Sequence, residues 1–134
     1  MSRSGYTDDC EDNWAMIRWR GAVNSATKGK RGQQFFRDLL AALDAMPNKR
    51  LITESLVSDG EFCTLGVLGA ARGIDLEKLD PDDSEQVSSA FGIADCLARE
   101  VVWMNDEPYH HTPEQRFSFM RKWVESKITK EPTQ

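Results

Sequence analysis

The chain has 134 residues, 40% of them hydrophobic and 29% charged, which suits one ordinary globular domain and excludes a second full one. Acidic residues number 22 against 17 basic ones, so the formal net charge is −5 and a general cationic coat for nucleic acid or anionic lipid is absent. The three cysteines lie far apart, which fits neither a disulfide framework nor a zinc knuckle, and no apolar run is long enough to span a membrane. We expect a cytoplasmic protein that is neither exported nor embedded in a membrane.

Two helices are predicted at the start of the chain. We expect residues 1–8 to be flexible, and a helix capped by the oxygens of Thr7, Asp8 and Asp9 to run to about Lys28 and stop at Gly29. The helically spaced residues that we expect on its buried stripe are Cys10, Trp14, Ile17 and Gly21. A second helix starts near Gly32 and ends before Pro47. Its predicted buried stripe consists of Phe36, Leu39, Leu40 and Leu43.

A β-hairpin is predicted at about 50–65, because two β-prone segments flank Ser58-Asp59-Gly60, whose Asp-Gly pair tolerates positive φ. A short helix then ends at Gly73, and another, capped by Asp80, runs from about Pro81 to Phe91 before Gly92. A further helix is predicted over residues 93–105.

The last helix has the clearest signals. Its start combines a cap, an N1 proline and a capping-box glutamine in Thr112-Pro113-Glu114-Gln115, and its apolar stripe is Phe117, Met120, Val124 and Ile128. We expect residues 129–134 to fray. The predicted fold is therefore mainly α (α+β): five to six helices around one core with a single β-hairpin, in one domain over residues 9–128.

Charge is segregated along the chain although the net value hides it. The stretch from Arg18 to Arg37 contains cations and no acid, whereas Asp75–Glu85 is acidic with Lys78 as its single base. The centre of the basic run, residues 28–32, is a Gly-bounded turn at a helix N-terminus, where anions bind readily. It is either a solvated helix–helix turn or a contact surface. The predicted partner-binding residues are Arg18, Trp19, Arg20, Lys28, Lys30, Arg31 and Arg37.

Trp19 belongs to this set because it lies between two arginines and off the predicted apolar stripe of its helix. An exposed aromatic residue within a basic face is the composition of an interface hot spot. The two charged segments together could also support head-to-tail self-association, which stays open as an alternative.

Two other features admit a functional interpretation. Residues 87–101, which turn at Gly92, have the layout of a helix-turn-helix, so a DNA-binding regulator is an alternative, although Asp95 and Glu100 suit DNA poorly. His110-His111 with Asp106 and Glu107 resembles a weak metal site, but adjacent histidines point apart and a solvated loop is the simpler interpretation. We predict no cofactor, no metal and no catalytic residue, because no motif places a nucleophile beside a base.

Several segments taken together resemble a family of small, functionally uncharacterised tailed-phage and prophage accessory proteins. They are Met1-Ser2-Arg3-Ser4-Gly5-Tyr6, Trp19-Arg20-Gly21-Ala22-Val23, Gly29-Lys30-Arg31-Gly32-Gln33, Leu40-Ala41-Ala42-Leu43-Asp44-Ala45-Met46-Pro47 and Phe91-Gly92-Ile93-Ala94. The resemblance implies a phage-encoded protein that acts in the cytoplasm of the bacterial host. It identifies no catalytic or binding residues in this chain.

The sequence thus predicts a non-enzymatic protein that binds a host or defence protein with an acidic surface. The alternatives are the DNA-binding regulator and a protein or enzyme that binds a small ligand at Lys30, Arg31 and an interior pocket.

Overall fold

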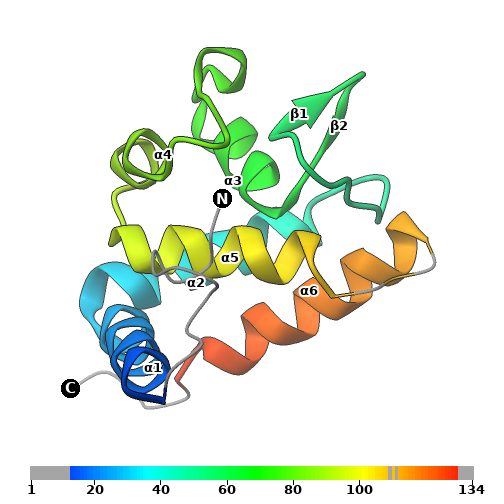
Figure 1. Cartoon of the computed structure of the whole chain (residues 1–134). Helices are drawn as coiled ribbons and strands as arrows, with labels where there is room; N and C mark the ends of the chain where they lie inside the picture. Colours follow the sequence, from blue (N-terminus) through cyan, green and yellow to red (C-terminus); the bar gives the residue numbers. More distant parts are fainter. Residues whose placement is uncertain (1–12, 109, 111, 130–134) are drawn as a thin grey trace.

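The computed structural model describes residues 13–108, 110 and 112–129. Its elements are α1 (Asn13–Lys28), α2 (Lys30–Asp44), β1 (Val57–Ser58), β2 (Glu61–Phe62), α3 (Thr64–Arg72), the 3₁₀ helix η2 (Leu76–Lys78), α4 (Ser84–Phe91), α5 (Asp95–Asp106) and α6 (Pro113–Lys127) (Figure 1). The prediction of a mainly helical fold with one small hairpin is confirmed. The predictions on residues 1–8, on the Thr7–Asp9 cap, on Cys10 and on His111 lie outside the described residues.

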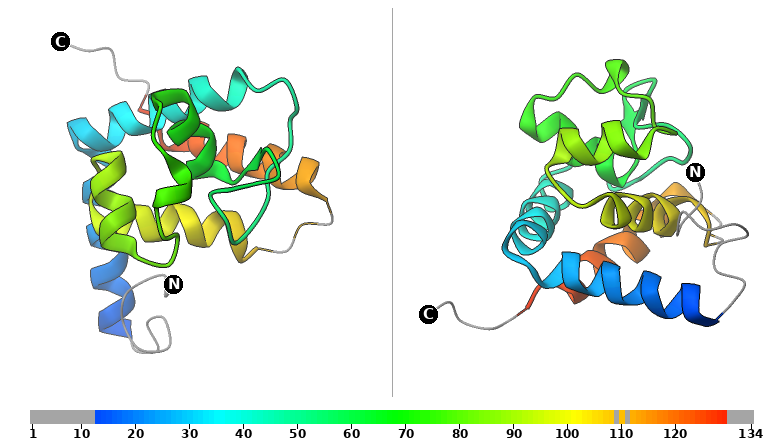
Figure 2. Two further views of the ribbon diagram at one scale, coloured as in Figure 1. Left: turned by 90° about the horizontal axis from the view of Figure 1, so that it is seen from above. Right: turned by 60° about the vertical axis from the view of Figure 1, so that its left-hand side comes forward.

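Helix α5 lies at the centre of the molecule. It packs against α1, α3, α4 and α6, and the views of Figures 1 and 2 show the other helices arranged around it. Its Leu97, Ala98 and Val101 are at most 1% exposed. The apolar side chains from the surrounding helices therefore meet in a single core.

Helix α1 is rotated about its axis relative to the sequence prediction. Its buried residues are Ala15, Trp19, Val23 and Thr27. Trp14 and Ile17, which were predicted to be buried, are 70% and 58% exposed. Both sets follow helical spacing, so periodicity alone could not decide between them. Contacts of α1 with the next helix, α2, and with α5, which is far along the chain, select the Trp19 face.

Helix α2 largely matches its prediction, although it begins at Lys30 instead of near Gly32. Phe36, Leu39 and Leu43 are fully buried, whereas Leu40 is only half-buried at the edge of the core. Arg121 of α6 donates two hydrogen bonds, of 2.6 and 3.1 Å, to the carboxylate of Asp44 at the end of α2. These hydrogen bonds and the positive charge of Arg121 lower the pKa of Asp44.

The hairpin is shorter than predicted. Val57 pairs with Phe62 and Ser58 with Glu61, and the turn residues Asp59 and Gly60 both have positive φ, as a two-residue turn of this kind requires. Residues 51–56 form an irregular segment, which is joined to the rest of the fold by hydrogen bonds such as the one from the Ile52 N–H to the Phe62 carbonyl.

Several helix ends that depend on local signals agree with the sequence. Gly73 and Gly92 have left-handed φ as predicted, and the hydroxyl of Thr112 accepts a hydrogen bond of 3.0 Å from the Gln115 N–H. The predicted start of α4 is wrong, because Asp83 caps this helix through a 3.1 Å bond from the Gln86 N–H. Asp80 instead accepts from the Asp82 N–H within a turn that precedes the helix. Among the described residues, no helix is long and apolar enough to cross a membrane.

Candidate functional site

The turn between α1 and α2 carries three exposed cations, Lys28, Lys30 and Arg31. We call these three residues, with Gly29 and Gly32, the basic turn. A cavity of about 240 Å³ lies against it, lined on one side by residues 29–32 and on the other by Ile93, Ala94 and Leu97. Sequence analysis predicted the turn and its cations, but not its neighbour from the α4–α5 connection, which is distant in the chain.

Gly32 allows the two helices to meet so closely. A Cβ atom at this position would lie 1.9 Å from the carbonyl oxygen of Ala26 and 2.8 Å from that of Thr27. Both distances are far shorter than van der Waals contact, and both obstacles are backbone, which cannot swing aside. The tight α1–α2 connection therefore depends on the missing side chain.

Gln33 holds the turn from the inside. Its side chain is 6% exposed, and its Nε2 donates to the carbonyl oxygens of Thr27 (2.8 Å) and Lys127 (2.9 Å). Its Oε1 accepts from the N–H of Thr129 at 2.9 Å. One buried amide thus satisfies terminal carbonyls of both α1 and α6. The predicted fraying therefore does not begin at Thr129, and residues 130–134 lie outside the described residues.

Two helix N-termini adjoin the cavity beside the basic turn. The N-cap of α2 is Gly29 and that of α5 is Ala94, and neither provides a side-chain cap. The first turn of α2 also contains no acid. The partial positive charge at the start of α2 therefore adds to the charges of Lys30 and Arg31, whereas Asp95 in the first turn of α5 offsets that of the other helix. The arrangement favours carboxylates or other anions.

The other predicted cations, Arg18, Arg20 and Arg37, do not lie on one common face with the basic turn. Arg18 and Arg20 are exposed, but successive helical positions differ by roughly 100°, so the two project from opposite flanks of buried Trp19. Arg37 is exposed about two turns beyond Lys30 on α2. The six cations therefore form a basic turn with outlying arginines along both helices, rather than one flat face.

The prediction that Trp19 is part of the contact surface is wrong. Its side chain is 4% exposed, and its Nε1–H donates to the carboxylate of Glu100 on α5 at 3.3 Å. Its neighbours Arg18 and Arg20 point elsewhere, because adjacent residues of a helix share no face. The exposed tryptophan of α1 is Trp14.

Most cations between Arg18 and Arg37 differ from the arginines elsewhere in the chain in their ion pairs. Arg50, Arg72, Arg99 and Arg121 each form an ion pair with a carboxylate. Among the described residues, no ion pair involves Arg20, Lys28, Lys30, Arg31 or Arg37. These five charges are available to a partner, whereas the paired arginines stabilise contacts within the fold.

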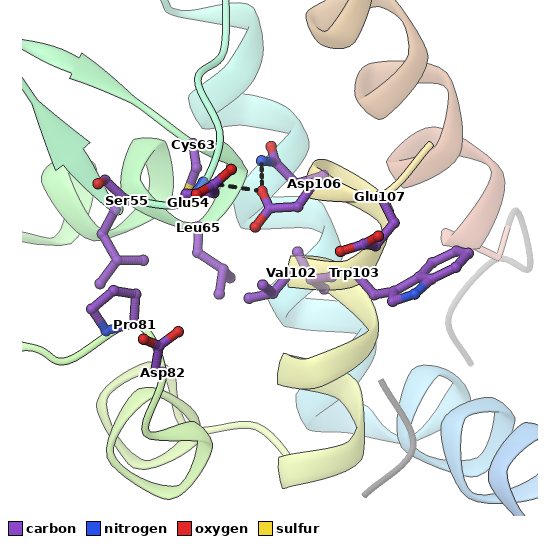
Figure 3. Close-up of a pocket in the computed structure, with 13 residues that line it drawn as sticks. Glu54, Ser55, Cys63, Leu65, Pro81, Asp82, Val102, Trp103, Asp106 and Glu107 are labelled. Carbon is purple, nitrogen blue, oxygen red and sulfur yellow. Dashed lines mark hydrogen bonds between the residues drawn. The ribbon is translucent and has the colours of Figure 1, made fainter. Parts of the chain in front are cut away.

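A second cavity, of about 310 Å³, lies between the segment 54–56, α3 and the C-terminal half of α5 (Figure 3). Its lining includes the carboxylates Glu54, Asp82, Asp106 and Glu107, a cluster that sequence analysis missed. Glu54 has a φ of 67°, rare for a residue other than glycine, and its N–H donates to Asp106 at 3.3 Å. The four acids come from three separate segments, so no spacing along the chain could have revealed them.

Asn105 and Cys63 form the inner wall of this acidic cavity. Asn105 is 2% exposed, accepts from the N–H and hydroxyl of Thr64 (3.1 and 2.7 Å), and donates to the Ile52 carbonyl at 2.9 Å. Burial raises the pKa of the Cys63 thiol to about 11, and its sulfur accepts from the Gly66 N–H. The thiol stays protonated near neutral pH and is a poor nucleophile.

The helix-turn-helix layout is present as α4, Gly92 and α5, but α5 would be the helix that reads DNA. Leu97, Ala98, Glu100 and Val101 of α5 are buried against the surrounding helices. A recognition helix must present one face to the major groove. The central position of α5 therefore gives the DNA-binding alternative little support.

His110 packs its ring against that of Phe119, with the centroids 4.9 Å apart. Burial, and then the positive charge of Arg116, lower the pKa of this imidazole. Among the described residues, no group of three or more His, Cys, Asp or Glu side chains could hold a metal ion.

In comparisons with known proteins, no protein-family model matches the chain, and no match is found among curated proteins or solved structures. The resemblance to phage accessory proteins therefore stays a prediction from the sequence.

Proposed function

We propose that this protein is a non-enzymatic binding protein that docks its basic turn onto an acidic surface of a protein partner. The observation that carries the proposal is the group of exposed cations at Lys28, Lys30 and Arg31, which have no carboxylate partner among the described residues. The start of α2 at the adjoining cavity, which has neither a side-chain cap nor an acid in its first turn, adds to the local positive potential. Complementary charge at such a surface speeds association and selects the partner.

The biological context proposed for this binding is that of a phage accessory protein acting on a host or defence protein in the bacterial cytoplasm. It rests on the sequence resemblance described above. The charge distribution favours a protein partner over duplex DNA, because the net charge is −5 and the basic turn carries only three exposed cations.

The test compares capture of partners from bacterial lysate by the tagged protein and by the double variant Lys30→Glu/Arg31→Glu. We expect the variant to lose the captured protein, because charge reversal replaces attraction by repulsion at the contact, a change of several kcal/mol. Its stability should not fall. Both positions lie in the first turn of α2, where a negative charge is favoured by about 0.3–1 kcal/mol.

The matched control reverses two charges of the acidic segment, as Glu77→Lys/Asp82→Lys. Both residues are exposed, whereas Asp83 is unsuitable because it caps α4. The control should capture the partner normally. Retained capture by the Lys30→Glu/Arg31→Glu protein would place the contact surface elsewhere, and a large drop in its melting temperature would mean that these cations are structural. Capture of DNA in place of a protein would favour the regulator instead.

A further inference from the structure

The cavity beside the basic turn combines an apolar floor with a basic rim. Its floor consists of Ile93 and Leu97, which are 6% and 1% exposed. Lys30 and Arg31, both exposed, line it from the side of the basic turn. In Figure 1 the cavity lies at the junction between α1 and α2, beside the start of α5. Two cations thus border an opening whose base is hydrocarbon.

The size of this cavity suits one amino-acid side chain better than a cofactor. Its volume is about 240 Å³, whereas pockets that take drug-sized molecules enclose roughly 300–1,000 Å³. Gly29 and Gly32 contribute no side chain to its wall, and Ala26 and Ala94 contribute only a methyl group each. A side chain of leucine size therefore enters without displacing another.

The charge around the cavity is positive and available to a partner. None of the lining residues is acidic. Among the described residues, no ion pair involves Lys30, Arg31 or the adjacent Lys28. Asp95, which follows Ala94 at the opposite wall, forms its ion pair with Arg99 at 2.8 Å. This charge favours an occupant that brings carboxylates of its own.

We infer that the partner presents an acidic segment in which an apolar side chain of leucine size has carboxylate residues as its direct neighbours. The apolar side chain fills the cavity, and the carboxylates contact Lys30 and Arg31 at its rim. Successive residues of a chain are only about 3.8 Å apart, so the two contacts require neighbouring positions. The inference rests on the proposed function and adds the class of peptide that the basic turn selects.

The apolar contact supplies most of the selectivity. Exposed ion pairs alone contribute little to affinity, because water and salt screen them. Burial of a leucine side chain, in contrast, is worth about a factor of ten or more in affinity. An acidic surface without such a side chain therefore binds the basic turn only weakly.

The experiment titrates three synthetic peptides of equal length into the ¹⁵N-labelled full chain at low salt. Their central residues are Asp-Leu-Asp, Asp-Ser-Asp and Asn-Leu-Asn. Shifts of the amide signals of residues 25–32 and 93–97 locate the contact and give each dissociation constant. The Asp-Leu-Asp peptide should bind at least about tenfold more tightly than either of the others.

Two variants fill the cavity without changing a charge. Ser25→Met and Ala94→Met each add a long side chain at a lining position that is not buried. In both, the affinity for the Asp-Leu-Asp peptide should fall to that for Asp-Ser-Asp, because only the contact with the cations remains. The matched control Ala22→Met, exposed on α1 and outside the lining, should bind all three peptides like the unmodified chain. Circular dichroism checks that each variant is folded, and one folded variant of the two suffices.

Equal affinities for the Asp-Leu-Asp and Asp-Ser-Asp peptides would overturn the inference and leave the proposed function intact. So would a preference for leucine that persists after the cavity is filled. If none of the peptides shifts these amides, the inference is wrong, and capture from lysate by the Lys30→Glu/Arg31→Glu protein decides the proposed function separately. Equal binding of Asn-Leu-Asn and Asp-Leu-Asp would contradict both, because the cations would then take no part.

Discussion

Replacement of Trp19 by alanine tests the rotation of α1 about its axis, on which both the composition of the binding surface and the exposure of Trp14 and Ile17 depend. The side chain is 4% exposed, and its Nε1–H is bonded to Glu100, which is itself 7% exposed. Removal of a buried tryptophan costs about 3–5 kcal/mol through lost burial and the resulting cavity. It also takes a donor away from a buried carboxylate. We expect Trp19→Ala to lose about 4 kcal/mol of unfolding free energy, a large part of the stability of a domain of this size.

Urea unfolding followed by far-UV circular dichroism measures this loss without relying on tryptophan fluorescence. Trp19→Phe separates the two contributions: it keeps most of the buried ring, so its cost should be about 1–3 kcal/mol, mainly from the hydrogen bond to Glu100. Trp14→Ala, on the exposed face of the same helix, should change stability by less than about 0.5 kcal/mol. A small effect at Trp19 together with a large one at Trp14 would refute the observed orientation of α1 and restore the stripe predicted from the sequence.

Three further predictions concern the core and the turn. Gln33→Ala should lower the unfolding free energy by about 2–3 kcal/mol in urea denaturation, because it leaves the carbonyls of Thr27 and Lys127 without their hydrogen-bond donor. An unchanged midpoint of the urea transition would show that water replaces the amide. Leu39→Ala, at a fully buried position, should cost about 2–5 kcal/mol in the same assay, and an effect below about 1 kcal/mol would mean that α2 is placed wrongly. Burial raises the pKa of Cys63 from 9.0 to about 11. The protonated thiol therefore contributes fully to the free energy of unfolding below pH 9, and this contribution, at most about 2.7 kcal/mol, is lost as the pH rises towards 11. Cys63→Ser should weaken this alkaline loss, and identical pH profiles for the two proteins would contradict the raised pKa.

Features that depend on neighbouring residues were predictable from the sequence. The cap at Thr112, the left-handed glycines after α3 and α4, and the Asp-Gly turn of the hairpin each depend on a few adjacent positions, and all occur in the structure. The cations of the basic turn were also expected to be exposed, because long charged side chains are rarely buried without a partner.

Features that depend on distant contacts were not predictable. Two stripes of α1 have the same helical period, and only contacts such as the one between Trp19 and Glu100 decide which is buried. Likewise, Gln33 could not be recognised as a cap of α6, because Lys127 is distant in the chain. The start of α4 is a local feature that was nevertheless predicted wrongly: Asp80 and Asp83 are both good N-cap residues, and the turn that Asp80 forms with Asp82 leaves the cap to Asp83.

Binding of an acidic polypeptide to the ¹⁵N-labelled protein, followed by NMR chemical shifts at low salt, tests most directly whether the basic turn is the anion-binding surface. With poly-glutamate as the probe, the largest shifts should occur at the amides of residues 29–32 and 93–95, around the cavity between α2 and α5. They should disappear in Lys30→Glu/Arg31→Glu and with rising salt, and persist in Glu77→Lys/Asp82→Lys. Shifts spread evenly over all surface cations, or the same shifts in the Lys30→Glu/Arg31→Glu protein, would contradict the assignment of this turn as the binding surface.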